Sequence, residues 1–282
     1  MNEISDHPAW RGMTRAELDA AYDNTNAVAD SGKRRDAWIE RSARLRERMP
    51  EALDLAYGPR PRNRIDLFRC GAPKAPLFAF IHGGYWQRNS KEIFACMSEG
   101  PTARGFDVAA IGYTLAPDAT LTEIAAEIAS AVRWLRHEGP SYGVGQDRLV
   151  VSGWSAGGHL TATTLAMDEV DAGLAISGIY DVEPCRLNYL NEKLRLTAEE
   201  AAAMSPILHL PRRSAPVTLA YGTGELPELQ RQSVAYHEAR LAADLPSRLL
   251  PLDAHNHFSI MDELAAPNGR LTEAAQALLV TL

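Results

Sequence analysis

Short apolar segments alternate with amphipathic ones along most of the chain. Mostly apolar runs of strand length occur at residues 77–81, 108–111, 149–151, 173–176, 216–221 and 249–252. Between these runs the apolar residues repeat with helical spacing, most clearly at Ile124, Ile128, Val132 and Leu135 of 122–137, and also in 156–166, 228–242 and 270–280. Uniformly apolar strands are typical of a parallel sheet covered on both faces, and strands that alternate with helices predict an α/β layered fold.

The N-terminal part of the chain has a different pattern. Residues 14–48 read as helical, because Thr14 followed by Glu17 forms a capping-box sequence and an Arg-rich amphipathic stretch continues until Pro50. This pattern predicts a helical N-terminal arm, residues 1–50, that precedes the main fold.

Two further segments complete the predicted organisation. Residues 53–57 and 64–68 alternate apolar and polar positions around a Gly-Pro turn, which predicts a pair of strands at a sheet edge. Residues 180–213 interrupt the strand–helix rhythm and are expected to form an insertion over the strand ends. We therefore expect a single domain over 1–282, composed of an α/β layered core, the arm and the insertion.

Composition narrows the class of protein. The chain has 282 residues, 46% of them hydrophobic and 23% charged, as is typical of globular proteins. A net charge of −7 and the lack of a basic face argue against nucleic-acid binding. No apolar run reaches the roughly 18 residues of a membrane span, and residues 1–9 do not form a leader, so we expect a cytoplasmic protein. Three cysteines without a CxxC pattern do not indicate a disulfide framework.

The most specific motif is Gly-Trp-Ser-Ala-Gly at 153–157. A predicted strand precedes it and a predicted helix follows, which is the context of a nucleophile elbow with Ser155 at its tip. The tight turn requires small residues two positions on either side of the serine, and glycines occupy both. The alternative is a glycine-rich turn between strand and helix whose serine has no catalytic role.

A second motif, His-Gly-Gly-Tyr-Trp at 82–86, directly follows the predicted strand at 77–81. In lipases and esterases a loop of this type supplies a backbone N–H to the oxyanion hole. Each such donor contributes about 3 kcal/mol to transition-state binding. We expect the His82 side chain to hold the loop rather than to transfer protons.

A serine hydrolase of this type needs an acid and then a histidine after the serine. His255 and His257 both follow the last predicted strand, and the residues alone leave the choice open. Glu225, after the strand at 216–221, is the candidate acid, with Asp181 and Asp253 as rivals. Asp181 is more plausibly a helix cap or a loop brace.

Two nearby features have simpler readings. Glu228 is expected in the first turn of the next helix. His255 and His257 are spaced like a pair of metal ligands, but no third ligand is suitably placed, so we expect no metal and no cofactor.

Together these motifs resemble the serine-dependent kynurenine formamidases (arylformamidases) of the α/β-hydrolase superfamily. The matching segments are HGGYWQ at 82–87, GWSAGGHL at 153–160, PELQRQS at 227–233 and HFSI at 257–260. The resemblance implies Ser155 as nucleophile, Glu225 as acid and His257, rather than His255, as the base. It also implies an oxyanion hole formed by the N–H groups of Gly84 and Tyr85, joined by that of Ala156. Glutamate at 225 is a departure, since the family usually has aspartate there.

The resemblance further implies deformylation of N-formyl-kynurenine to kynurenine and formate. A carboxylesterase for small acyl esters would use the same catalytic residues and is the main alternative. A non-catalytic binding protein of this fold would be expected to lack a triad residue.

Three aromatic residues flank the motifs: Trp86, Trp154 and Phe258. They are expected to contact substrate, unless they only pack the loops. The expected partner is therefore a small molecule, and neither nucleic acid nor a membrane. The arm is expected to cap the cleft or to pack at a homodimer interface.

Overall fold

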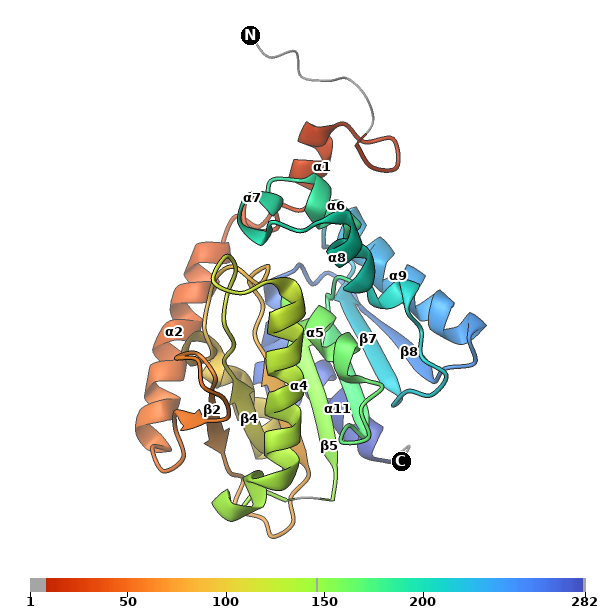
Figure 1. Ribbon diagram of the computed structural model, residues 1–282. Helices are drawn as coiled ribbons and strands as arrows, with labels where there is room; N and C mark the ends of the chain where they lie inside the picture. The colour runs from red at the N-terminus through yellow and green to blue at the C-terminus, as the bar shows by residue number, and fades with distance from the viewer. Residues whose placement is uncertain (1–8, 146, 281–282) are drawn as a thin grey trace.

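A twisted, mostly parallel sheet forms the centre of the computed structural model, which describes residues 9–145 and 147–280 (Figure 1). The described residues form eight strands in the order β1-β2-β4-β3-β5-β6-β7-β8. The strands are β1 (Leu55–Ala56), β2 (Arg64–Phe68), β3 (Leu77–Ile81), β4 (Asp107–Ile111), β5 (Leu149–Trp154), β6 (Ala172–Ile176), β7 (Val217–Gly222) and β8 (Ser247–Leu252). Strands β3 to β8 pair in parallel, whereas β1 and β2 form an antiparallel edge. The predicted fold class and the predicted edge pair are confirmed.

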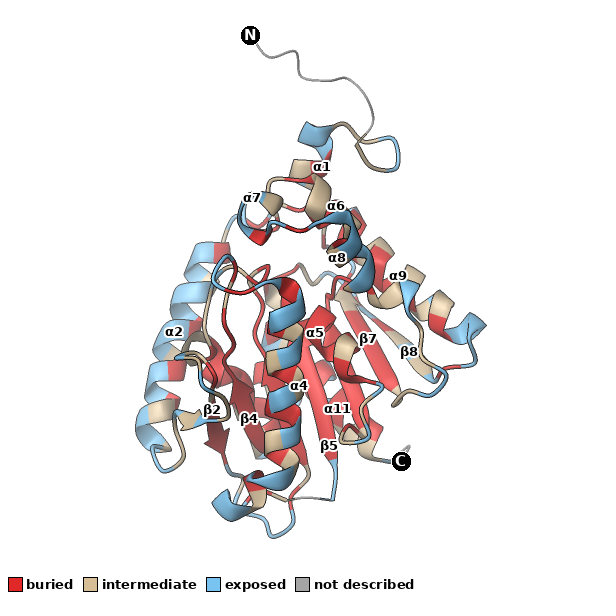
Figure 2. Ribbon diagram, viewed as in Figure 1, coloured by how far each residue is buried: buried red, intermediate tan, exposed pale blue. Residues whose placement is uncertain are grey.

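Helices cover both faces of this sheet, as the apolar strands require. The α-helices are α1 (Arg15–Ala21), α2 (Ser31–Arg48), α3 (Glu99–Ala103), α4 (Leu121–His137), α5 (Ala156–Thr164), α6 (Glu183–Leu187), α7 (Asn191–Leu194), α8 (Ala198–Ala203), α9 (Pro227–Ala242), α10 (Asp262–Ala265) and α11 (Arg270–Val280). The 3₁₀ helices are η1 (Lys91–Ser98), η2 (Gly139–Tyr142), η3 (Pro206–Leu208) and η4 (Ser259–Met261). One apolar core includes side chains from α4, α5 and α9, and a second includes side chains from α2, η1, α10 and α11. Figure 2 shows the resulting buried strands between half-exposed helices.

The arm is two helices rather than the continuous helical stretch expected over 14–48. The capping box forms as predicted, with Thr14 and Glu17 bonded reciprocally at the start of α1. Helix α1 then ends at Ala21, and the Asp23 side chain accepts hydrogen bonds from the Asn26 backbone N–H at 3.2 Å and side-chain amide at 2.5 Å. Such short polar side chains compete with the helical hydrogen bonds of the backbone, which accounts for the break. Residues 1–8 of the predicted arm lie outside the described residues.

Helix α2 is tied to the antiparallel edge of the sheet by a buried carboxylate. Asp66 of β2 is fully buried, and its oxygens lie 2.7 Å from Lys91 Nζ and 3.0 Å from Arg46 Nε of α2. The backbone N–H of Asp54 also donates to Asp66, at 2.8 Å. Because a buried charge is costly unless it is paired, this network holds α2 firmly against the sheet.

The segment 180–213 contains α6, α7, α8 and η3 and lies above the carboxyl ends of the strands, beside α1 (Figure 1). The Tyr189 N–H donates to the Asp19 carboxylate of α1 at 2.8 Å, so the segment and the arm contact each other. No helix in the described part of the chain is long and apolar enough to cross a bilayer.

Candidate active site

Ser155 occupies a strained turn between β5 and α5. Its φ of 57° and ψ of −116° lie outside the regions that non-glycine residues usually adopt. A Cβ atom on Gly157 would lie 2.0 Å from the Ile81 carbonyl oxygen, and one on Gly153 would lie 2.3 Å from the Gly157 carbonyl oxygen. Only glycine fits at both positions. Strain and close packing at a strand-to-helix turn are the geometry expected of a nucleophile elbow.

The structure brings Glu225 and His257 together. His257 Nδ1 lies 2.7 Å from Glu225 Oε2, and both side chains are buried. The other carboxylate oxygen, Oε1, accepts hydrogen bonds from Ser177 Oγ at 2.6 Å and from the Gly222 N–H at 2.7 Å. Because a carboxylate only accepts, Nδ1 carries the imidazole proton, and Nε2 is the nitrogen that is free to act as a base.

The rival histidine and acids have other positions. His255 Nε2 lies 3.4 Å from Glu263 Oε1, and His255 does not line the pocket that contains Ser155. Asp253 is exposed. Asp181 Oδ1 accepts a hydrogen bond from the Glu183 N–H at 3.2 Å, so Asp181 braces the loop before α6, whereas the N-cap residue of that helix is Val182.

Glu228 lies in the first turn of α9, as expected, and pairs with Arg231 at 2.7 Å. Of the acids considered from the sequence, Glu225 is the one that contacts His257.

The loop after β3 has an unusual backbone. Gly84, Tyr85 and Trp86 have positive φ angles of 124°, 51° and 58°. A Cβ atom on Gly84 would lie 2.4 Å from the Arg88 carbonyl oxygen, so the tight turn requires glycine. The hydrogen bonds within the described residues leave the N–H groups of Gly84 and Tyr85 unused. Both residues line the pocket beside Ser155, while the third expected donor, Ala156, is buried at the first position of α5.

His82 holds this loop in place, as expected. Its Nδ1 lies 2.9 Å from the Gly83 carbonyl oxygen, and its ring stacks on Tyr113 with the ring centroids 4.3 Å apart. The Tyr113 hydroxyl donates to the His82 carbonyl oxygen at 2.9 Å. Burial lowers the pKa of His82 to about 4, so the imidazole is neutral at neutral pH.

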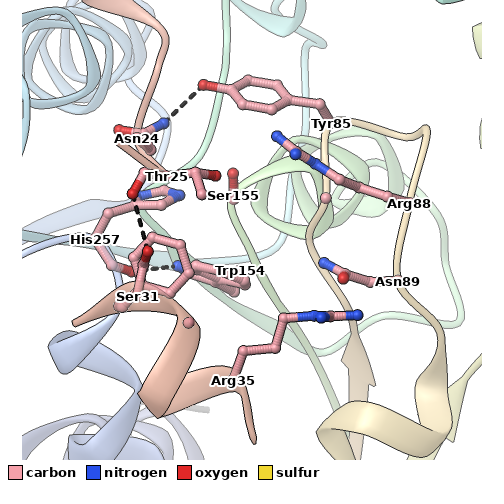
Figure 3. A pocket seen from close by; sticks show the side chains of 13 residues that line it. Asn24, Thr25, Ser31, Arg35, Tyr85, Arg88, Asn89, Trp154, Ser155 and His257 are labelled. Atoms are coloured by element: carbon pink, nitrogen blue, oxygen red, sulfur yellow. Dashed lines mark hydrogen bonds between the residues drawn. The ribbon is translucent and has the colours of Figure 1, made fainter. Parts of the chain in front are cut away.

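A cavity of about 390 Å³ contains Ser155 and His257 (Figure 3). Its walls come from four parts of the chain: the arm, the loop after β3, the segment that carries Ser155 and the segment that carries His257. The lining residues are Asn24, Thr25, Ser31, Gly32, Arg35, Gly84, Tyr85, Arg88, Asn89, Trp154, Ser155, His257 and Phe258. The arm therefore covers the site.

The expected aromatic contacts are present in part. Trp154 and Phe258 line the cavity, but Trp86 does not and is fully buried. The Trp86 ring packs edge-on against His159 of α5, with centroids 5.0 Å apart. The expectation that Trp86 contacts substrate is therefore wrong for this cavity, because its side chain lies in the core.

Trp154 connects the elbow to the histidine segment. Its Nε1 donates to the His257 carbonyl oxygen at 2.9 Å, and its ring lies 4.8 Å from the His257 ring. Trp38 of α2 packs edge-on against Trp154 at 5.8 Å and stacks on Phe258 at 6.0 Å. These rings join the arm to the residues that flank both Ser155 and His257.

Sequence reasoning missed several of these residues. Ser177, which directly follows β6 and has a φ of 49°, gives no pattern that links it to Glu225. The position of Ser177 at the carboxyl end of a central strand was the available signal, because active sites of open α/β sheets form at that edge. The arm was expected to cap the cleft or to pack at a homodimer interface, and it does line the pocket, but no sequence pattern pointed to the residues that do so.

Comparisons with known proteins agree with this architecture. The family model described as BD-FAE matches residues 66–177. The chain is 28% identical to a kynurenine formamidase of Danio rerio, over 94% of this chain and 96% of that protein. It is 25% identical to a probable isoprenylcysteine alpha-carbonyl methylesterase of Arabidopsis thaliana, over 74% of this chain and 52% of that one. A crystal structure of a putative thioesterase from Silicibacter sp. TM1040 is 29% identical, covers 91% of this chain and 98% of its own, and has a TM-score of 0.81.

The fold and the relatives define the protein as an α/β hydrolase. Within that superfamily it is an arylformamidase-like hydrolase, as the motifs predict.

The hydrogen bond from Trp154 to the His257 carbonyl can be tested by replacing the indole with a ring that lacks the donor. We expect Trp154→Phe to lower kcat about tenfold, because a lost hydrogen bond of about 1 kcal/mol lets the His257 segment shift. Steady-state kinetics measure the effect, and circular dichroism confirms folding. Trp134→Phe, at a half-buried tryptophan that packs against Tyr142 at a tilted angle, is the matched control. Equal kcat in both variants would contradict this positioning role.

Two buried histidines make the free energy of unfolding depend on pH. Burial lowers the pKa of His159 to about 4, as it does for His82, while an unfolded histidine titrates near pH 6.5. The unfolded state therefore binds more protons between these values, and the free energy of unfolding falls as pH drops below about 6.5. Each histidine contributes up to about 1.4 kcal/mol per pH unit.

Urea unfolding between pH 7.5 and 5 measures this slope. His159→Gln keeps a donor for the Met204 carbonyl oxygen, which lies 2.7 Å from Nε2, but removes the titration. We expect a shallower slope for this variant than for the wild type. Parallel curves for the two proteins would show that His159 is not responsible.

Proposed function

We propose that this hydrolase removes the formyl group from an aryl formamide of the N-formyl-kynurenine type, using Ser155, His257 and Glu225. The observation that carries the proposal is the buried Glu225–His257 pair, whose histidine lines the same pocket as Ser155. Similarity to kynurenine formamidases over 94% of the chain supports formamide as the substrate class. Trp154 and Phe258 give the cavity flat aromatic walls, which suit an aryl group.

In the acylation step Ser155 Oγ attacks the formyl carbon, and His257 Nε2 accepts the serine proton. Glu225 stabilises the imidazolium that forms, through its contact with Nδ1. The carbonyl oxygen of the substrate becomes an oxyanion, which the N–H groups of Gly84, Tyr85 and Ala156 bind. When the tetrahedral intermediate collapses, His257 gives its proton to the departing aryl amine, and a formyl ester of Ser155 remains.

In the hydrolysis of this ester, water replaces Ser155 as the nucleophile and Ser155 replaces the amine as the leaving group. His257 takes a proton from water as the water oxygen attacks the formyl carbon, the proton passes to Ser155 Oγ, and formic acid leaves and ionises to formate. The fixed Nδ1–H tautomer is important in both steps, because it keeps Nε2 available to accept and return the proton.

A carboxylesterase for small acyl esters is the second candidate. The similarity to a probable methylesterase favours it, and an ester would use the same nucleophile, base and oxyanion donors. The two functions differ in the leaving group. An amine departs only when it is protonated, whereas an alkoxide or phenoxide leaves more easily.

Paired kinetics distinguish the two candidates. We expect kcat/KM for N-formyl-kynurenine to exceed that for p-nitrophenyl acetate at least tenfold. Ser155→Ala should reduce the turnover of both substrates by a factor on the order of 10⁶, because the triad acts as a unit. His257→Gln should be similarly severe, whereas His255→Gln, the matched control, should stay within about threefold of the wild type, because His255 is not in the pocket.

Fast ester cleavage without deformylation would replace this proposal with the esterase. Retention of most activity by Ser155→Ala, or a greater loss in the His255 variant than in the His257 variant, would refute the catalytic roles.

A further inference from the structure

The pocket has a charge that differs from that of the whole chain. Its described lining residues include two arginines, Arg35 and Arg88, and neither an aspartate nor a glutamate. The chain as a whole carries a net charge of −7. An active site that is cationic in an acidic protein favours a negatively charged substrate, because unlike charges attract and the local potential concentrates such ligands.

The two side chains reach the pocket from different elements. Arg35 extends from α2, and Arg88 extends from the loop after β3 that also carries Gly84 and Tyr85 (Figure 3). The guanidinium carbon of Arg88 lies 6.0 Å from the centre of the Tyr85 ring, which orients the side chain beside the expected oxyanion donors.

Arg35 also differs from the other arginines of α2. Arg34, Arg41, Arg44, Arg46 and Arg48 each form an ion pair with a carboxylate. Among the ion pairs formed by the described residues, none includes Arg35 or Arg88. Two guanidinium groups therefore line one cavity without a carboxylate, and both would attract an anionic ligand.

We propose that Arg35 and Arg88 form an anion subsite that selects substrates with a carboxylate on the leaving group. This inference rests on the proposed deformylation: a formyl group carries only hydrogen, so the anionic group belongs to the amine part of the substrate. A guanidinium binds a carboxylate through two parallel N–H···O bonds, which fixes orientation as well as charge. The arm then has a part in choosing the substrate, because it supplies Arg35.

Two synthetic substrates test the subsite. Both are ortho-formamidophenyl ketones; the side chain of one ends in a carboxylate, and that of the other ends in a methyl group. The full-length wild type should favour the carboxylate substrate at least tenfold in kcat/KM. Arg35→Gln and Arg88→Gln should each reduce this preference at least fivefold, because each removes a charge-assisted contact. The ratio of the two substrates cancels differences in the fraction of folded enzyme.

Arg44→Gln is the matched control, because Arg44 lies on the same helix, is exposed and is absent from the pocket. It should keep the wild-type preference, and Arg88→Lys should keep more of it than Arg88→Gln. Added salt should weaken the preference in the wild type.

Equal kcat/KM for the two ketones in the wild type would overturn the subsite and leave the deformylase function standing. An unchanged preference in both glutamine variants would also overturn it. If neither ketone is deformylated while p-nitrophenyl acetate is cleaved, the proposed function fails and the inference fails with it.

Discussion

The carboxylate of Glu225 is the contact on which the arrangement of the site depends. It accepts hydrogen bonds from Ser177, which follows β6, from Gly222 at the end of β7, and from His257 in the segment after β8. These strands are parallel, so their carboxyl ends meet at one edge of the sheet, where Ser155 also lies at the end of β5. One buried anion thus joins three neighbouring strand ends and orients the imidazole. Its burial is tolerable because it accepts hydrogen bonds from three donors.

The N-terminal arm completes the wall of the pocket. The break between α1 and α2 places Asn24 and Thr25 over the cavity, and the first turns of α2 add Ser31, Gly32 and Arg35. The network around Asp66 fixes the far end of α2, while Trp38 packs against Trp154 and Phe258 at the near end. Because these contacts are buried, α2 is held in a fixed position as one wall of the pocket.

The sequence predicted the frame of the site well because that frame is encoded locally. Apolar runs located the central strands, and β2 and β3 begin and end at the predicted residues. The elbow was also predictable, because the tight turn around the serine leaves no room for a Cβ atom at Gly153 or Gly157. The choice of His257 over His255 came from resemblance, and the contact with Glu225 is in agreement with it.

What the sequence did not predict depends on contacts between distant residues. Trp86 was expected in the pocket, but the positive φ angles of its loop turn the ring toward His159 in the core. The helical stretch expected over 14–48 is interrupted between α1 and α2, where the Asp23 side chain accepts a hydrogen bond from the Asn26 side chain. The two arginines of the pocket lie far apart in the sequence. Arg35 and Arg88 line one cavity only because α2 packs beside the loop after β3.

The orienting role of Glu225 is tested most directly by Glu225→Gln, which keeps the shape of the side chain and removes its charge. The carboxamide can donate to Nδ1 and so favour the wrong imidazole tautomer. We expect a loss in kcat on the order of 10⁴ with the fold retained. Glu228→Gln should keep kcat within about tenfold of the wild type, because Glu228 pairs with Arg231 and does not contact His257. If Glu225→Gln also retained activity within tenfold, Glu225 would not be the residue that orients His257.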